Sequence, residues 1–182
     1  MLHGLDSAVD WSSLLWLFPV LFMFHDFEEI LTVEEWADRN RDKVLGTLPP
    51  FARKALYASL FCGTRRFALD VLYVYGFIVA FTGMAAFFSF YLPFLAALSL
   101  FFLHAFTHVF QAIYLKMYTP GVTTSILIVL PYSVYAFYRL ISSGMAGWGD
   151  IGGSLLLLLL AGPPLFVLLL RGRAKSYRDI TG

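Results

Sequence analysis

The sequence has very few of the residues on which disulfide-bonded, cysteine-ligated or water-soluble domains depend. It contains one cysteine, Cys62, in 182 residues, so no disulfide can form within the chain and no metal site can be built from paired cysteines. Charged residues make up 14% and hydrophobic residues 59%, so a soluble fold of this size would lack the polar side chains to cover its surface. The N-terminus has no basic segment followed by a small-residue cleavage site, so we expect no signal peptide. The formal net charge of +1 gives no indication of a nucleic-acid partner.

Long apolar segments are what the chain has in abundance. A helix needs about 20 apolar residues to cross the hydrocarbon core of a membrane. Five segments reach this length: 11–33, 66–91, 94–117, 120–141 and 151–170. We therefore expect an all-α, polytopic transmembrane bundle of about five membrane-spanning helices, forming one integral membrane domain over residues 1–182. In the polar stretch after the first segment, residues 51–62 have apolar side chains at helical spacing, which predicts an amphipathic helix on the membrane surface.

The basic residues predict how this bundle is oriented, because cytoplasmic loops of membrane proteins are enriched in Lys and Arg. With five spans, only Arg139 falls near one side of the membrane. The other twelve basic residues fall on the opposite side: Arg39, Arg41, Lys43, Arg53, Lys54, Arg65, Arg66, Lys116, Arg171, Arg173, Lys175 and Arg178. We therefore expect the N-terminus outside and the C-terminus in the cytoplasm.

Ionisable residues within membrane helices are energetically costly, and they usually face the interior of a bundle or a functional site. In the first segment, His25, Glu28 and Glu29 are spaced i, i+3 and i+4, so they share one helix face, which Thr32 continues. In the third segment, the residues at i, i+4 and i+7 are polar and again share one face: His104, His108 and Gln111. Asp70 lies near the start of the second segment.

The depths of these residues in the membrane match. Counting from cytoplasmic ends at Val33 and Lys116, His25 and His108 both lie about 12 Å inside, and Glu29 lies about 6 Å inside. All the polar faces therefore fall in the cytoplasmic half of the bundle. We expect them to form one site, with Thr32, Asp70 and Gln111 lining it.

Two histidines at i and i+4 on a helix can bind one metal ion, as they do in zinc metallopeptidases. His104 and His108 have this spacing, but no glutamate lies between them, so a general base would come from Glu28 or Glu29. His25 or one of the same carboxylates, Glu29 in particular, would complete the ligand set. A set of nitrogen and oxygen ligands suits zinc first, then iron or manganese, and argues against copper(I). Carboxylate-rich helical bundles can also hold two metal ions.

These observations predict a metal-dependent membrane enzyme, of hydrolase type, that acts on a lipid-soluble or membrane-embedded substrate. Membrane lipids and a hydrophobic small molecule are the expected partners, and the oligomeric state is left open. Three alternatives stay open. The same cluster would serve a proton- or ion-coupled transporter, a haem protein with paired axial histidines, or a non-catalytic partner protein whose polar residues only join helices.

The motif His25-Asp-Phe-Glu28-Glu29 resembles that of a bacterial family of integral membrane proteins named for H-x-x-E-E. A second match is His108 followed by Tyr118-Thr-Pro-Gly121-Val-Thr123, because the family carries a histidine upstream of a similar Y-T-P-G-V-x-T stretch. The resemblance implies a multi-pass protein of the bacterial inner membrane. It carries over His25, Glu28, Glu29 and His108 as motif residues, and it implies no known activity.

A second, weaker resemblance involves the residues that follow the first segment. Glu34, Glu35 and Arg39 fit the E-E-x-x-x-R pattern of the prenyl-protein (CAAX-type) membrane proteases. The later motifs of that family, F-x-x-x-H and H-x-x-x-N, have no match around His104 and His108.

Overall fold

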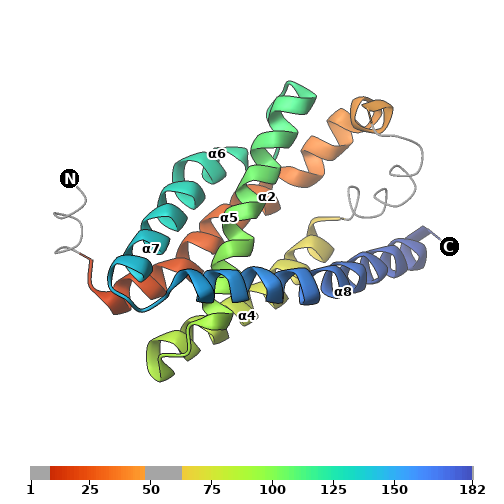
Figure 1. Ribbon diagram of the computed structural model, residues 1–182. Coiled ribbons are helices and arrows are strands. Elements are labelled where there is room, and N and C mark those ends of the chain that lie inside the picture. Colours follow the sequence, from red (N-terminus) through yellow and green to blue (C-terminus); the bar gives the residue numbers. More distant parts are fainter. Residues whose placement is uncertain (1–8, 48–62, 182) are drawn as a thin grey trace.

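The structure, a computed structural model, describes residues 9–47 and 63–181, excepting the side chains of residues 165, 166 and 168–181. Every regular element within these residues is helical, which confirms the all-α expectation. The elements are α2 (Trp11–Thr47), α4 (Thr64–Phe88), α5 (Leu92–Leu115), α6 (Val122–Thr124), the π-helix η1 (Ser125–Val129), α7 (Leu130–Ser142) and α8 (Trp148–Thr181). Figure 1 shows that α6, η1 and α7 form one continuous rod beside α2 and α5, and that α8 crosses the bundle in contact with α4 and α5.

Three helices in the described part of the chain are long and apolar enough to cross a membrane: Thr64–Phe88, Leu92–Leu115 and the rod Val122–Ser142. They indicate a multi-pass membrane protein. The first half of α2 is also apolar, but its polar residues from His25 onward lower its hydropathy. The five-span architecture and its orientation remain predictions.

The first helix is longer than the sequence analysis predicted. We expected it to end near Val33, whereas α2 continues to Thr47, so the polar stretch from residue 34 to 47 is helical. Contacts four residues apart stabilise this extension, including an ion pair between Glu35 and Arg39. Leu48-Pro49-Pro50 follows, and proline disfavours helical backbone in the residue before it. The predicted surface helix at 51–62 lies outside the described residues.

The last helix is also longer than predicted at both ends. α8 begins at Trp148, before the predicted start at residue 151, and it continues beyond residue 170 to Thr181. At its start, the Asp150 carboxylate accepts a hydrogen bond from the Gly147 N–H at 2.8 Å, which satisfies one of the free donors of a helix N-terminus. Hydropathy locates only the apolar part of a helix, so it misses polar ends of this kind.

The apolar core fills the half of the bundle that contains the start of α2. Its fully buried side chains come from α2, α5 and α7, among them Leu14, Phe18, Phe94, Leu95 and Leu140. At the same end of the molecule, the Arg139 guanidinium lies 5.1 Å from the Trp11 ring and donates to the Val9 carbonyl at 3.1 Å. The polar residues of α2 therefore lie in the opposite half of the bundle.

The π-helix η1 changes the helical register between α6 and α7, so that side chains from both segments contact α2. In a regular α-helix, Thr124 and Tyr132 would point about 80° apart, because each residue adds about 100°. A π-turn accommodates one extra residue and brings the two onto nearly the same face. Thr124 accordingly contacts His25 at 2.8 Å, and the Tyr132 hydroxyl donates to the Leu14 carbonyl at 3.0 Å. Pro131, whose ring would clash with the carbonyl four residues earlier in an α-helix, explains why the wider turn occurs here.

Candidate metal site

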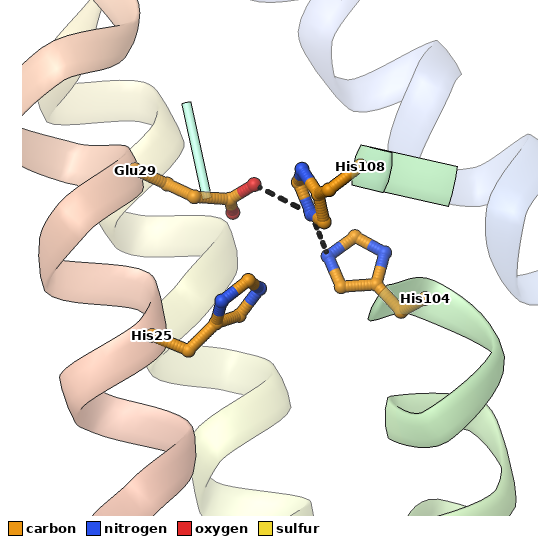
Figure 2. Close-up of side chains that lie close together, drawn as sticks. All are labelled: His25, Glu29, His104 and His108. Atoms are coloured by element: carbon orange, nitrogen blue, oxygen red, sulfur yellow. Dashed lines mark hydrogen bonds and ion pairs between the residues drawn. The ribbon is translucent and has the colours of Figure 1, made fainter. Parts of the chain in front are cut away.

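Four side chains from two facing helices converge in the polar half of the bundle. His25 and Glu29 extend from α2, and His104 and His108 extend from α5 toward them (Figure 2). Each offers one ligand atom, and these atoms all lie within 4.8 Å of one another. His25, Glu29 and His108 are buried, whereas His104 is partly exposed. We refer to these four residues as the His/Glu cluster, and they can hold a metal ion.

The distances within the His/Glu cluster are those of converging ligands. His108 Nε2 lies 3.0 Å from Glu29 Oε1 and 2.8 Å from His104 Nε2. A neutral imidazole has one N–H, so His108 Nε2 cannot donate to both neighbours at once. Ligands of a tetrahedral zinc ion, with bonds of about 2.0–2.1 Å, lie about 3.3 Å apart, which is close to these separations. A cation among these atoms would relieve the excess of lone pairs.

Glu28 lies next to the His/Glu cluster but is fully occupied by other donors. Its Oε1 accepts from the Tyr118 hydroxyl at 2.6 Å and from the Thr123 N–H at 3.3 Å. Its Oε2 accepts from the Thr124 N–H at 2.8 Å and from the Thr124 hydroxyl at 2.6 Å. A carboxylate has about four lone-pair positions, so none remains for a metal or for a proton from a substrate. The contacts favour a positioning role for Glu28, and its predicted role as a general base stays a prediction.

The turn before α6 packs directly against the His/Glu cluster. Gly121 has φ of +82°, a backbone conformation that residues with a side chain rarely adopt. A Cβ atom at this position would lie 2.8 Å from His108 Cε1 and 3.0 Å from Glu29 Oε1. Gly121 was predicted only as part of a motif, and the structure shows that the absence of its side chain makes room for His108 and Glu29.

Tyr118 joins this turn to α2 at the edge of the site. Its hydroxyl donates to Glu28, and its carbonyl accepts from the Trp36 indole N–H at 2.7 Å. Burial raises the pKa of Tyr118 to about 12, and the hydrogen bond to Glu28 acts in the same direction. The phenol therefore stays protonated at neutral pH and remains a donor to Glu28.

The other predicted site residues lie around the His/Glu cluster rather than in it. Asp70 is buried and forms an ion pair with Arg66 at 2.9 Å. Gln111 is exposed on α5. Thr32 donates to the Glu28 carbonyl at 2.6 Å, one turn along α2. Their predicted role in lining the site stays a prediction.

The residues of the weaker resemblance lie away from the His/Glu cluster, whereas a residue outside the predicted site contacts it. Glu34 and Glu35, the residues of the weaker resemblance, are exposed on α2 and contact Thr64 and Arg39 instead of the His/Glu cluster. Thr124, which contacts both His25 and Glu28, was not among the predicted site residues. The signal that could have identified it is the last fixed position of the Y-T-P-G-V-x-T pattern, which falls on Thr124 when the pattern begins at Tyr118.

The sequence matches one family of known proteins. The model of a family described as "protein of unknown function with HXXEE motif" matches residues 16–136. The matched segment contains the whole His/Glu cluster and also the turn with Tyr118 and Gly121. No curated protein and no solved structure matches the chain.

Proposed function

The chain belongs to the HXXEE family of proteins of unknown function, and we propose that it is a metal-dependent membrane enzyme whose ion is held by the His/Glu cluster. The observation that carries this proposal is the convergence of three imidazoles and one carboxylate, from α2 and α5, within 4.8 Å. A buried group of this kind, placed in a bundle with an otherwise apolar core, is costly unless an ion or a reaction requires it.

The ligand set supports one ion, with zinc as the first candidate and iron or manganese next. Three nitrogens and one oxygen suit these metals. A pair of metal ions would need bridging carboxylates, as in di-iron bundles. Glu28 is the nearest further carboxylate on the same helix face, and its four hydrogen bonds already occupy it. Among the described residues, the group of possible ligands contains Glu29 as its single carboxylate.

A hydrolytic reaction requires an open position on the metal, and four protein ligands would close a tetrahedral zinc site. In our proposal His25, His104 and His108 hold the ion. Glu29 would leave the metal when water binds and would then act as the general base. The ion would acidify a bound water, and Glu29 would accept the proton of that water. The Glu29 carboxylate lies 3.0 Å from His108 Nε2, so it would be within hydrogen-bond reach of a water bound beside His108.

The partial exposure of His104 supports a substrate that arrives from the lipid phase. His104 is the one ligand of the cluster that is not buried. Its neighbours Leu103 and Phe106 are 48% and 49% exposed, so an apolar surface of α5 leads to the ligand from the side. A lipid-soluble or membrane-embedded substrate would reach the metal by this route, within the bacterial inner membrane that we infer for the protein.

The haem alternative is not favoured by the spacing of the histidines. Two axial nitrogens on opposite sides of one iron would lie about 4 Å apart, twice a metal–nitrogen bond of about 2.0 Å. The Nε2 atoms of His104 and His108 are 2.8 Å apart, which leaves no space for a macrocycle between them.

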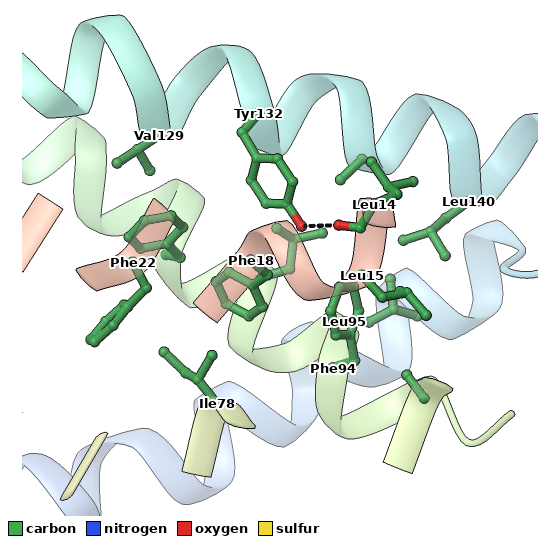
Figure 3. Packing of buried hydrophobic residues seen from close by; sticks show 14 of the residues in the cluster. Leu14, Leu15, Phe18, Phe22, Ile78, Phe94, Leu95, Val129, Tyr132 and Leu140 are labelled. Atoms are coloured by element: carbon green, nitrogen blue, oxygen red, sulfur yellow. Dashed lines mark hydrogen bonds between the residues drawn. The ribbon is translucent and has the colours of Figure 1, made fainter. Parts of the chain in front are cut away.

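The transporter alternative would need a polar path through the rest of the bundle. Beyond the His/Glu cluster the buried polar side chains are mostly single hydroxyls, such as Thr82 and Ser133, set among apolar residues. Figure 3 shows Phe18 and Phe22 of α2 within this apolar packing, where the Phe18 ring contacts those of Phe94 and Tyr132 and the Phe22 ring contacts that of Tyr75. Phe101 closes the cluster on this side, with its ring 5.7 Å from that of His25. This packing leaves no continuous polar path across the described part of the bundle, which favours an enzyme site open to one side over a transport pathway.

The first experiment is elemental analysis of the full chain, purified in detergent without chelator. We expect about one equivalent of zinc, iron or manganese in the wild type and none in the double variant His104→Ala/His108→Ala. Tyr114→Ala, at an exposed position on the same helix, is the matched control and should retain the metal. A wild-type protein without bound metal would contradict the proposal and favour transport or a purely structural cluster.

A further inference from the structure

The side of His25 that faces away from the cluster is held by a chain of hydrogen bonds. His25 Nδ1 lies 2.8 Å from Thr124 Oγ1, which in turn lies 2.6 Å from Glu28 Oε2. These contacts join the first two fixed residues of the H-x-x-E-E motif through a threonine 99 positions after the histidine. The motif therefore acts together with the turn that contains Thr124.

The direction of each hydrogen bond follows from counting protons. All four contacts to Glu28 come from N–H or O–H groups, so the carboxylate is ionised and can only accept. The single proton of the Thr124 hydroxyl points to Glu28 at 2.6 Å, in preference to the neutral Gly121 carbonyl at 3.4 Å. The Thr124 oxygen must then accept a hydrogen bond from the Nδ1–H group of His25.

A neutral His25 with a proton on Nδ1 has a free lone pair on Nε2. This Nε2 atom is buried and has no hydrogen-bond partner among the residues that the structure describes. Figure 2 shows the His25 ring pointing toward Glu29 and the two histidines of α5. The free lone pair of His25 Nε2 therefore belongs to a ring that faces Glu29, His104 and His108.

We propose that Glu28 and Thr124 are positioning residues that hold His25 in its Nδ1–H tautomer, so that Nε2 is available to bind the metal ion. The ligand role of Nε2 rests on the function proposed above, whereas the tautomer itself does not. In this arrangement the two adjacent glutamates of the motif have different tasks. Glu28 orients a ligand through Thr124, and Glu29 is itself part of the His/Glu cluster, in direct contact with His108. Hydrogen bonds of this outer kind fix the orientation of ligand histidines and increase their basicity.

The first test measures the affinity of the metal-free full chain in detergent for Zn²⁺. Thr124→Val removes the hydroxyl but keeps the shape of the side chain, and it should weaken zinc binding about 10–100-fold. Glu28→Gln should weaken it similarly, and Thr124→Ser should restore most of the affinity. Thr123→Val is the matched control, because the Thr123 side chain makes none of these contacts and only its backbone N–H reaches Glu28. Wild-type affinity in a folded Thr124→Val protein would overturn the proposal.

The second test observes the tautomer directly by ¹⁵N NMR of histidine-labelled protein, with the His25 signals identified by their loss in His25→Gln. We expect His25 in the Nδ1–H form in the metal-free wild type and a mixture of tautomers in Thr124→Val. An Nε2–H form in the wild type would overturn the positioning proposal even if zinc binds. If the wild type binds no zinc but shows the Nδ1–H form, the metal proposal fails and the tautomer assignment stands.

Discussion

At the scale of single residues, the spacing of polar side chains identified the cluster. His25, Glu29, His104 and His108 were all predicted from helical periodicity and depth, and the structure brings them within 4.8 Å. Periodicity shows which residues share a helix face, but it cannot show which residue of a distant turn will meet that face. For this reason it could not find Thr124, and it could not separate the role of Glu28 from that of Glu29.

The contact of Gly121 with the cluster leads to a prediction for Gly121→Ala. The substitution should lower stability and also displace His108 or Glu29, because the new Cβ would lie 2.8 Å from His108 Cε1. The positive φ alone should cost about 1–2 kcal/mol. We therefore expect a lower melting temperature together with a loss of metal binding, measured by thermal unfolding in detergent and by zinc titration.

Gly144→Ala is the matched control for this prediction. Gly144 has a similar φ of +70°, but a Cβ atom at this position would have no neighbour within 4 Å. The control should therefore lose stability from backbone strain and keep its affinity for zinc. If Gly121→Ala binds zinc as tightly as Gly144→Ala does, the turn does not shape the site.

At the scale of helices, apolar runs located the elements but not their polar ends. The helices α4 and α5 and the rod of α6, η1 and α7 follow the predicted segments closely, because each is apolar along its length. The extension of α2 beyond Val33 carries contacts that polar side chains make with groups one turn earlier, such as the Asn40 amide donating to the Trp36 backbone carbonyl at 2.8 Å. Hydropathy contains no information about such contacts. The π-turn of η1 was missed for a similar reason, since it is visible only in the backbone.

The extension of α2 also provides a link to α4 whose strength depends on pH. Glu34 accepts hydrogen bonds from the Thr64 N–H, at 2.8 Å, and from the Thr64 hydroxyl at the N-terminus of α4. These hydrogen bonds lower the pKa of Glu34 from its ordinary value of 4.5. Since the folded-state pKa is below the unfolded one, the stabilisation is fully present above about pH 4.5 and is lost as the pH falls through the folded-state pKa.

We therefore predict that Glu34→Gln lowers the melting temperature at neutral pH, and that the difference from wild type shrinks in acid. The loss should stay below about 1 kcal/mol, because the pair is exposed to solvent. Thermal unfolding of both proteins in detergent across this pH range measures it. Glu35→Gln is the control, since Glu35 pairs within its own helix and does not contact α4. An equal, pH-independent difference for both variants would show that Glu34 does not link the helices.

At the scale of the whole molecule, helix ends gather at two opposite ends of the bundle, and the assignment of these ends to the two sides of a membrane stays a prediction. In Figure 1 the start of α2, the end of α4 and the connection between α7 and α8 lie at one end of the bundle, and the end of α2 lies near the end of α5 at the other. Arg139, the basic residue predicted near the outer side, is buried at the first end, where Trp11 and Tyr135 contact its guanidinium. Cation–π contacts of this kind stabilise the Arg139 guanidinium, which lies far from the other basic residues in the sequence-based prediction.

The structure alone establishes three candidate spans, so whether α2 also crosses the membrane must be tested by accessibility. We propose single cysteines in a Cys62→Ser background, placed at exposed positions by Ser12→Cys, Asp42→Cys and Gly149→Cys. In spheroplasts, a membrane-impermeant maleimide should label the Ser12→Cys and Gly149→Cys proteins. The Asp42→Cys protein should react only after the membrane is permeabilised, because twelve of the thirteen basic residues predict a cytoplasmic location for that side.

The pattern of labelling separates the ways in which this prediction can fail. If Ser12→Cys and Asp42→Cys react equally, α2 does not cross the membrane, and the His/Glu cluster lies at its surface instead of within it. If all three sites react with the opposite sidedness, α2 crosses the membrane as predicted and the orientation is wrong. The predicted result would place the cluster in the cytoplasmic half of the membrane. An enzyme acting there would take its water from the cytoplasm and its hydrophobic substrate from the inner leaflet, by way of the partly exposed His104.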